Sequence, residues 1–91
     1  MKVNRLIQLL EQLNIHKFFY NINNDGTEST PDTTILDYTP RGISVYWSER
    51  NVIYDKRYFE DEDQAVDYFI ELLNNSSPHF KQFYKEHQDM F

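Results

Sequence analysis

Residues 42–73, GISVYWSERNVIYDKRYFEDEDQAVDYFIELL, contain the pattern that decides the fold. Residues 43–49 alternate between apolar side chains and polar or tyrosine side chains, which is the two-residue period of a half-buried strand. Arg50-Asn51 then forms a tight turn into a second strand over Val52 to Tyr54. The pattern becomes irregular after Tyr54, so the end of this strand stays open as far as Phe59. The stretch therefore predicts a β-hairpin.

A helix over residues 61–74 follows the hairpin. Asp61 suits the N-cap, and Gln64 three residues later completes a capping-box pattern. Acidic side chains crowd the first turn, where the helix dipole favours each by about 0.3–1 kcal/mol. The residues that repeat at helical spacing and predict its buried stripe are Ala65, Val66, Phe69, Ile70 and Leu73.

The same signals predict the rest of the chain as one α+β domain over residues 1–91. Short connections imply an antiparallel sheet of three to four strands, with helices covering one face. In the strand before the hairpin, Leu36 and Tyr38 share one face while Ile35 and Asp37 share the other. In chain order, the remaining elements are an N-terminal helix over residues 2–14, a strand over 15–22, a loop over 23–32, a strand over 33–39 and a third helix that begins at Ser77-Pro78.

The composition limits the location and the chemistry. The 91 residues include no cysteine, so no disulfide or thiolate chemistry is expected. The apolar N-terminal run is interrupted by Gln8 and Glu11, which argues against a signal peptide, and no apolar stretch reaches the roughly 18–20 residues of a membrane span. A cytoplasmic protein without membrane contact is expected.

The net charge of −6 has an uneven distribution. Six acidic residues and no basic residue lie between Glu60 and Glu71, which leaves 15 − 6 = 9 acidic against 9 basic residues elsewhere. This segment disfavours direct nucleic-acid binding, which needs basic surface. It indicates either a docking surface for a basic partner or a solvated helix start that its dipole stabilises.

Aromatic residues supply a second candidate surface. The chain has seven Tyr, seven Phe and one Trp. Because Tyr46 and Trp47 point to opposite faces of one strand, one of them is expected to be exposed. Exposed Tyr and Trp side chains are preferred anchors for protein partners, although cross-strand packing would also explain them.

Catalytic and metal sites are not expected. His16, His79 and His87 show no ligand spacing, and no nucleophile motif occurs. With Gly26 and Gly42 as the sole glycines, a glycine-rich phosphate loop is not expected either. No cofactor is predicted.

A calcium-binding loop over residues 21–32 is the nearest alternative. Asn21, Asn23, Asp25 and Gly26 match the first half of the EF-hand template. The twelfth position holds Asp32 instead of Glu, and a strand pattern follows where a helix should begin. These departures favour a polar turn.

Residues 45–73 resemble small bacterial immunity proteins of contact-dependent inhibition and polymorphic toxin systems. The resemblance rests on the strand end Tyr46-Trp47-Ser48-Glu49-Arg50, on Phe59 before the acidic run 60–63, and on the helix with Ala65 and Tyr68-Phe69. Asn51 and Gln64 stand where the family pattern has Gly and Glu. The resemblance implies a cytoplasmic protein that binds one secreted toxin domain, often a nuclease, and blocks its active site.

The predicted activity is therefore neutralisation of a cognate, basic toxin domain. An acidic nucleic-acid mimic that blocks a DNA- or RNA-binding protein is the alternative, and a small enzyme is a third. The chain is expected to be a monomer or a dimer. The residues predicted to bind the partner are Tyr46, Trp47, Glu49, Arg50, Tyr54, Tyr58, Glu60, Asp61, Glu62, Asp63 and Asp67.

Overall fold

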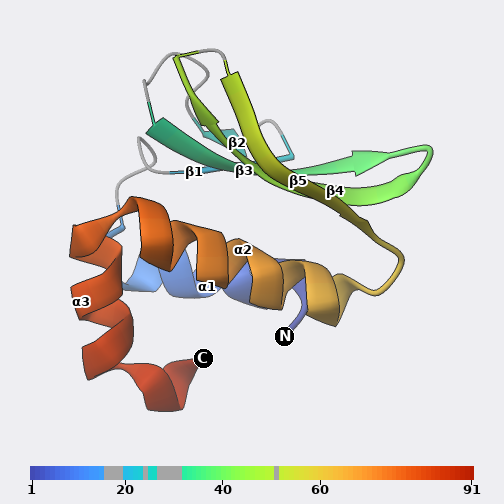
Figure 1. Ribbon diagram of the computed structural model, residues 1–91. Coiled ribbons are helices and arrows are strands. Elements are labelled where there is room, and N and C mark those ends of the chain that lie inside the picture. Colours follow the sequence, from blue (N-terminus) through green and yellow to red (C-terminus); the bar gives the residue numbers. More distant parts are fainter. Residues whose placement is uncertain (16–19, 24, 27–31, 51) are drawn as a thin grey trace.

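The computed structural model describes residues 1–15, 20–23, 25–26, 32–50 and 52–91. A twisted sheet forms one layer, and helices α1 and α2 lie side by side across one of its faces (Figure 1). Among the described residues, no helix has the length and apolar character needed to cross a bilayer. The elements are α1 (Val3–Gln12), β1 (Tyr20–Ile22), β2 (Asp25–Gly26), β3 (Asp32–Thr39), β4 (Gly42–Glu49), β5 (Val52–Phe59), α2 (Glu62–Ser76), α3 (Pro78–Glu86) and the 3-10 helix η2 (Gln88–Met90).

The strand order in the sheet is β2-β1-β3-β4-β5. β3, β4 and β5 form two successive antiparallel hairpins, as the sequence predicts. β1 instead pairs with β3 in parallel, with Tyr20 opposite Thr34 and Ile22 opposite Leu36. β2 runs antiparallel to β1, and β3 runs parallel to β1. The chain therefore reverses its direction twice between β1 and β3. The α+β class is confirmed, and the sheet is mostly antiparallel rather than wholly so.

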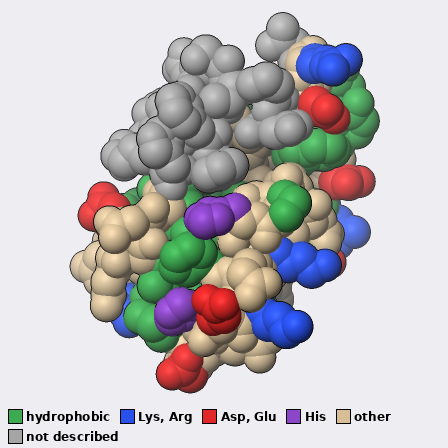
Figure 2. All heavy atoms as spheres, turned by 90° about the vertical axis from the view of Figure 1, so that its left-hand side faces the viewer, with side chains coloured by type: hydrophobic (Ala, Val, Ile, Leu, Met, Phe, Trp, Pro, Cys, Tyr) green, Lys and Arg blue, Asp and Glu red, His purple; other side chains and the backbone are tan. Residues whose placement is uncertain are grey.

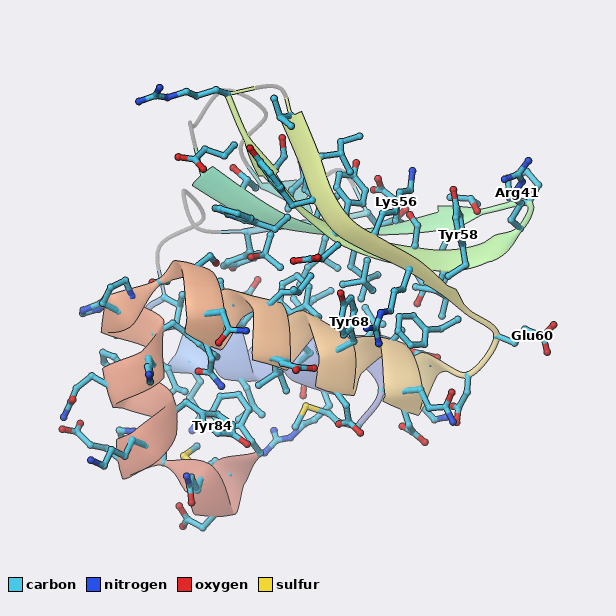
Figure 3. The ribbon with its side chains drawn as sticks, viewed as in Figure 1. Arg41, Lys56, Tyr58, Glu60, Tyr68 and Tyr84 are labelled. Carbon is cyan, nitrogen blue, oxygen red and sulfur yellow. The ribbon has the colours of Figure 1, made fainter. Side chains whose placement is uncertain are left out.

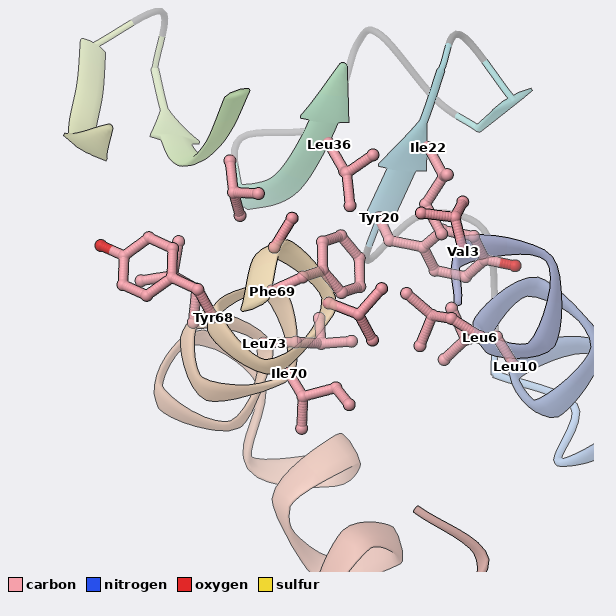
Figure 4. Close-up of a cluster of buried hydrophobic side chains, with 14 of the residues drawn as sticks. Val3, Leu6, Leu10, Tyr20, Ile22, Leu36, Tyr68, Phe69, Ile70 and Leu73 are labelled. Atoms are coloured by element: carbon pink, nitrogen blue, oxygen red, sulfur yellow. The ribbon is translucent and has the colours of Figure 1, made fainter. Parts of the chain in front are cut away.

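The two faces of the sheet have the predicted composition. Leu36 and Val45 are fully buried on the face that α1 and α2 cover. The side chains that alternate with them, such as those of Ile35 and Tyr46, point to the opposite face, which none of the described helices covers (Figure 1). This second face is called the open face below. The core between the layers contains Leu6 and Leu10 of α1, Tyr20 and Ile22 of β1, and Phe69, Ile70 and Leu73 of α2 (Figure 4).

The helix boundaries follow from their caps. Asp61 is the N-cap of α2, and its carboxylate accepts a 3.0 Å hydrogen bond from the amide of Asp63, one residue before the Gln64 that the capping-box pattern indicates. Ser77 caps α3 by accepting a 3.2 Å hydrogen bond from the amide of Phe80. α3 packs against the far end of α2 rather than over the sheet (Figure 1).

A β-bulge explains the irregular pattern of β5. The pairing with β4 shifts between Val45–Arg57 and Trp47–Tyr54, which leaves one extra residue on β5. The extra residue is Asp55, whose backbone has a left-handed conformation with φ of 55°. The bulge turns its carbonyl toward α2, where the hydroxyl of the buried Tyr68 donates a 2.6 Å hydrogen bond to it. β5 can therefore continue to Phe59 although its alternation is broken.

Some predictions cannot be compared with the structure. His16 and half of the stretch that resembles a calcium-binding loop, residues 24 and 27–31, lie outside the described residues. Where the structure describes the chain, it contains no group of three or more His, Asp or Glu side chains placed to hold a metal ion.

Candidate partner-binding surface

The acidic segment lies at the connection between β5 and the first turn of α2. Glu60 is exposed and its side chain points away from the body of the protein (Figure 3). Asp61 is also exposed, and one of its carboxylate oxygens caps α2. Within the described residues, no hydrogen bond or ion pair of the Glu60 side chain is found. Glu60 and Asp61 are thus accessible to a partner.

Glu62 and Asp63 are used inside the protein. The amide of Val3 donates a 2.6 Å hydrogen bond to Oε1 of Glu62, and Val3 is the first residue of α1. Lys2 occupies the N-cap of α1 but makes no side-chain cap bond, so Glu62 supplies an acceptor that the local sequence lacks. The carboxylate of Asp63 lies 2.9 Å from the N-terminal ammonium of Met1 and 3.3 Å from Nζ of Lys2. These two acidic residues join α1 to α2.

The ion pairs reduce the charge that the segment presents. Hydrogen bonds from the N-terminal ammonium and then from Lys2 hold the pKa of Asp63 below its usual value. With these two positive charges counted, the six acidic residues of the segment carry a net charge of −6 + 2 = −4. The sequence does not show this compensation, because the N-terminus and residue 63 meet only in the folded chain.

Tyr38 and Tyr58 lie at the same end of the sheet as the acidic segment. Tyr38 is 50% exposed and Tyr58 is 44% exposed. Partial burial, followed by the nearby negative charge of Glu62, raises the pKa of the Tyr38 hydroxyl. Tyr38 is one of the aromatic strand residues that the sequence offers as candidate anchors, but it was not among the residues predicted to bind the partner.

Tyr46 and Tyr58 share the open face with Lys56. The ammonium of Lys56 lies 4.9 Å from the ring centre of Tyr46 and 5.4 Å from that of Tyr58. The hydroxyl of Tyr46 donates a 3.4 Å hydrogen bond to Asp37. Burial and then the charge of Asp37 raise the pKa of Tyr46. Cation–π contacts hold the two rings in place, which suits a preformed contact surface.

Trp47 and Tyr54 lie on the other face of the same two strands. Their rings are 4.9 Å apart. Trp47 lines a pocket of about 120 Å³ together with Asp55, Leu72, Asn75 and Ser76. The indole nitrogen of Trp47 is buried and has no hydrogen-bond partner in the described part of the chain. These two predicted anchors are thus separated from Tyr46 and Tyr58 by the sheet itself.

Glu49 and Arg50 lie far from the acidic segment. Glu49 pairs with Val52 at one end of the β4–β5 hairpin, whereas Ile43 pairs with Phe59 at the other end. Eight residues of strand separate the two ends by about 25 Å at ~3.3 Å per residue. Glu49 and Arg50 cannot form the rim of a small surface that is centred on Glu60.

Asp67 is exposed on α2 but belongs to another face. It lines a shallow pocket with Met1, Ile70, Tyr84 and Phe91, on the side of α2 that faces α3. Toward the α3 end of the molecule, acidic, basic and histidine side chains are intermixed (Figure 2). No surface of a single charge is visible in this view.

The structure therefore brings together only part of the predicted site. The residues at the end of the sheet that leads into α2, called the acidic end below, are Tyr38 on the helix-covered face, Tyr58 on the open face, and Glu60 and Asp61 in the connection. Comparison of the chain with protein-family models, with curated proteins and with solved structures found no match.

Proposed function

We propose that the protein is an immunity protein that binds a cognate secreted toxin domain in the cytoplasm and blocks its active site. The sequence resemblance of residues 45–73 suggests the class, and the acidic end is the surface that supports it best. The observation that carries the proposal is that Glu60 and Asp61 lie at the end of the sheet where two tyrosines are exposed, with Tyr38 (50% exposed) on the helix-covered face and Tyr58 (44% exposed) on the open face.

The chemistry of this surface fits a basic protein partner. Carboxylates at the edge attract a positively charged groove over long range, which raises the association rate. Tyrosine side chains supply contact area at a small cost in conformational entropy. If the toxin is a nuclease, its substrate groove is basic, because it holds phosphates. The acidic end would then cover the groove.

The nucleic-acid mimic has less support. A mimic needs carboxylates spread along an extended face to replace a row of phosphates. Here Glu62 and Asp63 are bound to α1 and to the N-terminus, and Asp67 lies on another face. A compact contact surface suits the remaining acidic residues better.

The test first asks whether the gene just upstream encodes a large secreted protein, and it uses the C-terminal domain of that protein as the toxin. The two domains are co-expressed, and binding is measured by co-purification and by the recovery of cell growth. The variant that combines Glu60→Lys with Asp61→Asn keeps an N-cap residue but reverses the charge of the acidic end. We expect its association rate to fall by at least tenfold at low salt and to depend less on salt concentration.

A matched variant, Glu11→Lys with Asp89→Asn, makes the same change in net charge at exposed positions elsewhere. It should keep the association rate of the unmodified protein. If the unmodified protein and both variants associate with the toxin domain at the same rate, the acidic end is not the binding surface. Absence of binding and of growth protection by the unmodified protein would overturn the proposed function.

A further inference from the structure

The outer edge of β5 carries most of the exposed large apolar side chains. β5 is the last strand of the sheet, so among the described strands it has a neighbour on one side only. Val52, Ile53, Tyr54 and Tyr58 are 49%, 52%, 40% and 44% exposed. An edge strand with unpaired backbone groups and apolar side chains can pair with another strand.

The bulge decides which side chains share a face. Ile53 pairs with Ser48, and Tyr58 pairs with Ser44, so both point to the open face. Tyr54 pairs with Trp47 and Arg57 pairs with Val45, so both point to the helix-covered face. In a regular strand, residues 53 and 58 would point to opposite faces. The extra residue at Asp55 brings them to the same face.

The sequence of β5 is complementary to itself in one antiparallel register. A two-fold axis perpendicular to the sheet, placed between residues 55 and 56, keeps the open faces of two copies on the same side. In this arrangement, each pair of opposite residues must point to the same face of the joined sheet. The bulge makes this possible, because it brings residues such as 53 and 58 to one face. The pairs in this register are Val52 with Phe59, Ile53 with Tyr58, Tyr54 with Arg57, and Asp55 with Lys56.

The charges agree with this register. Asp55 of each copy lies opposite Lys56 of the other, and opposite charges in directly paired positions stabilise a sheet. Tyr54 lies opposite Arg57, whose guanidinium lies 4.7 Å from the ring centre of Tyr68 in the same chain, so no like charges meet at this pair. A shift by two residues also matches the faces, but it places Lys56 opposite Ile53 and shortens the overlap. Lys56 therefore disfavours pairing of β5 with any strand that places no acidic side chain opposite it, which is the general effect of charged residues on edge strands.

We propose that the chain forms a symmetric dimer in which the β5 strands of two copies pair and join their sheets into one. The dimer leaves Tyr38, Glu60 and Asp61 outside the paired strands and shares Tyr58 with the acidic end, and its formation does not require the toxin. The backbone pairing comes from residues 52–54 and 57–59, since the carbonyl of Asp55 is bound to Tyr68. An interface this small predicts weak association, with a Kd on the order of 10–100 μM.

The test is sedimentation velocity of the whole chain over a concentration series, with two charge variants. Asp55→Lys places like charges opposite Lys56, and Lys56→Asp places like charges opposite Asp55. Each variant alone should dimerise at least tenfold more weakly than the unmodified chain. An equimolar mixture should restore dimers, because each variant then supplies the charge that the other needs.

Two further measurements make the outcome decisive. Circular dichroism tests whether both variants are folded. If Asp55→Lys unfolds because of the left-handed backbone at this position, Asp55→Asn replaces it and is mixed with Lys56→Asp in the same way. This mixture should form more dimer than either variant alone, although less than a mixture with Asp55→Lys would. Asp89→Lys and Lys81→Asp are the controls, because they make the same charge changes at exposed positions away from β5.

The proposal is overturned if the unmodified chain stays a monomer up to about 1 mM, well above the Kd range expected of a small interface. It is also overturned if mixing the two variants yields no more dimer than each variant alone. Protection of the β5 amides from hydrogen exchange only after the toxin domain is added would assign this edge to the partner instead.

Discussion

The amide of Val3 donates a 2.6 Å hydrogen bond to the carboxylate of Glu62, which joins the first turns of two helices that are 59 residues apart in the chain. Asp63 adds ion pairs of 2.9 Å to the N-terminal ammonium and 3.3 Å to Lys2. The acidic run is therefore partly an internal connection between α1 and α2. Of its residues, Glu60 and Asp61 remain for the acidic end.

Removal of the Glu62 side chain should destabilise the protein. Glu62→Ala leaves the amide of Val3 without its acceptor, and a hydrogen bond to a charged group contributes about 1.5–3 kcal/mol. Since Glu62 is only partly buried, we expect a loss of about 1–2 kcal/mol in the free energy of unfolding. Glu62→Gln keeps an acceptor oxygen and should lose less than half of that. Urea unfolding measures both, and Glu71→Ala, at an exposed site of the same helix, should change stability by less than about 0.5 kcal/mol.

The ion pairs of Asp63 predict a specific pH dependence. Its pKa in the folded protein lies below the ordinary value of 3.8, so the unfolded chain binds the proton more tightly. The stabilising contribution is present above about pH 4 and is lost as the pH falls through the folded-state pKa. Asp63→Asn should therefore lower stability at pH 7 and flatten the decline of stability in acid.

Unfolding by urea between pH 7 and pH 2 tests this dependence. The curves for Asp63→Asn and the unmodified protein should converge at the acid end. Asp67→Asn is the matched control, because it makes the same substitution at an exposed position of α2 outside these ion pairs. A constant separation between the Asp63→Asn curve and the unmodified curve at every pH would contradict the assignment.

The period of the strands made much of the fold predictable. Alternation alone places Val45 and Trp47 on one face and Tyr46 on the other, and the structure confirms this. Asp61 and Ser77 mark the starts of α2 and α3 because capping depends on neighbouring residues only. Signals of this kind extend over a few residues and can be read without knowledge of the fold.

The features that could not be predicted depend on residues that are distant in the chain. The parallel pairing of Tyr20 with Thr34 depends on two reversals of the chain between β1 and β3. The ion pair between Asp63 and the N-terminal ammonium depends on where the N-terminus lies in the folded chain. The candidate surface was predicted from proximity in sequence, whereas β5 separates Arg50 from Glu60 by its full length. Sequence patterns thus indicate which side chains are exposed, but not which of them meet.

Gly42 should not tolerate a side chain. Its φ of +120° is unfavourable for other residues, and a Cβ at this position would lie 2.8 Å from the carbonyl oxygen of Phe59. Because that neighbour is backbone, relief requires β4 and β5 to separate. We expect Gly42→Ala to cost about 1–3 kcal/mol, the usual range for such strain. Arg41→Ala, at the adjacent exposed position, should cost less than about 0.5 kcal/mol. Equal unfolding midpoints in urea for the two variants would contradict this account.

Trp47 combines an aromatic contact with a polar group that lacks a partner. Its ring packs 4.9 Å from that of Tyr54, while its buried indole nitrogen has no hydrogen-bond partner within the described residues. Trp47→Phe keeps a ring beside Tyr54 and removes the N–H. Since a buried unsatisfied donor costs about 1–3 kcal/mol, its loss should offset much of the lost contact area, and we expect a net change below about 1 kcal/mol.

Trp47→Ala provides the comparison, because it removes the ring as well. Large aromatic truncations in a core cost about 3–5 kcal/mol, and the partial exposure of Trp47 reduces the expected loss to about 2–3 kcal/mol. Trp47 is the single tryptophan, so urea unfolding is followed by circular dichroism instead of fluorescence. If Trp47→Phe costs as much as Trp47→Ala, the indole N–H contributes a favourable hydrogen bond in solution, and the pocket beside Asp55 and Leu72 contains its acceptor.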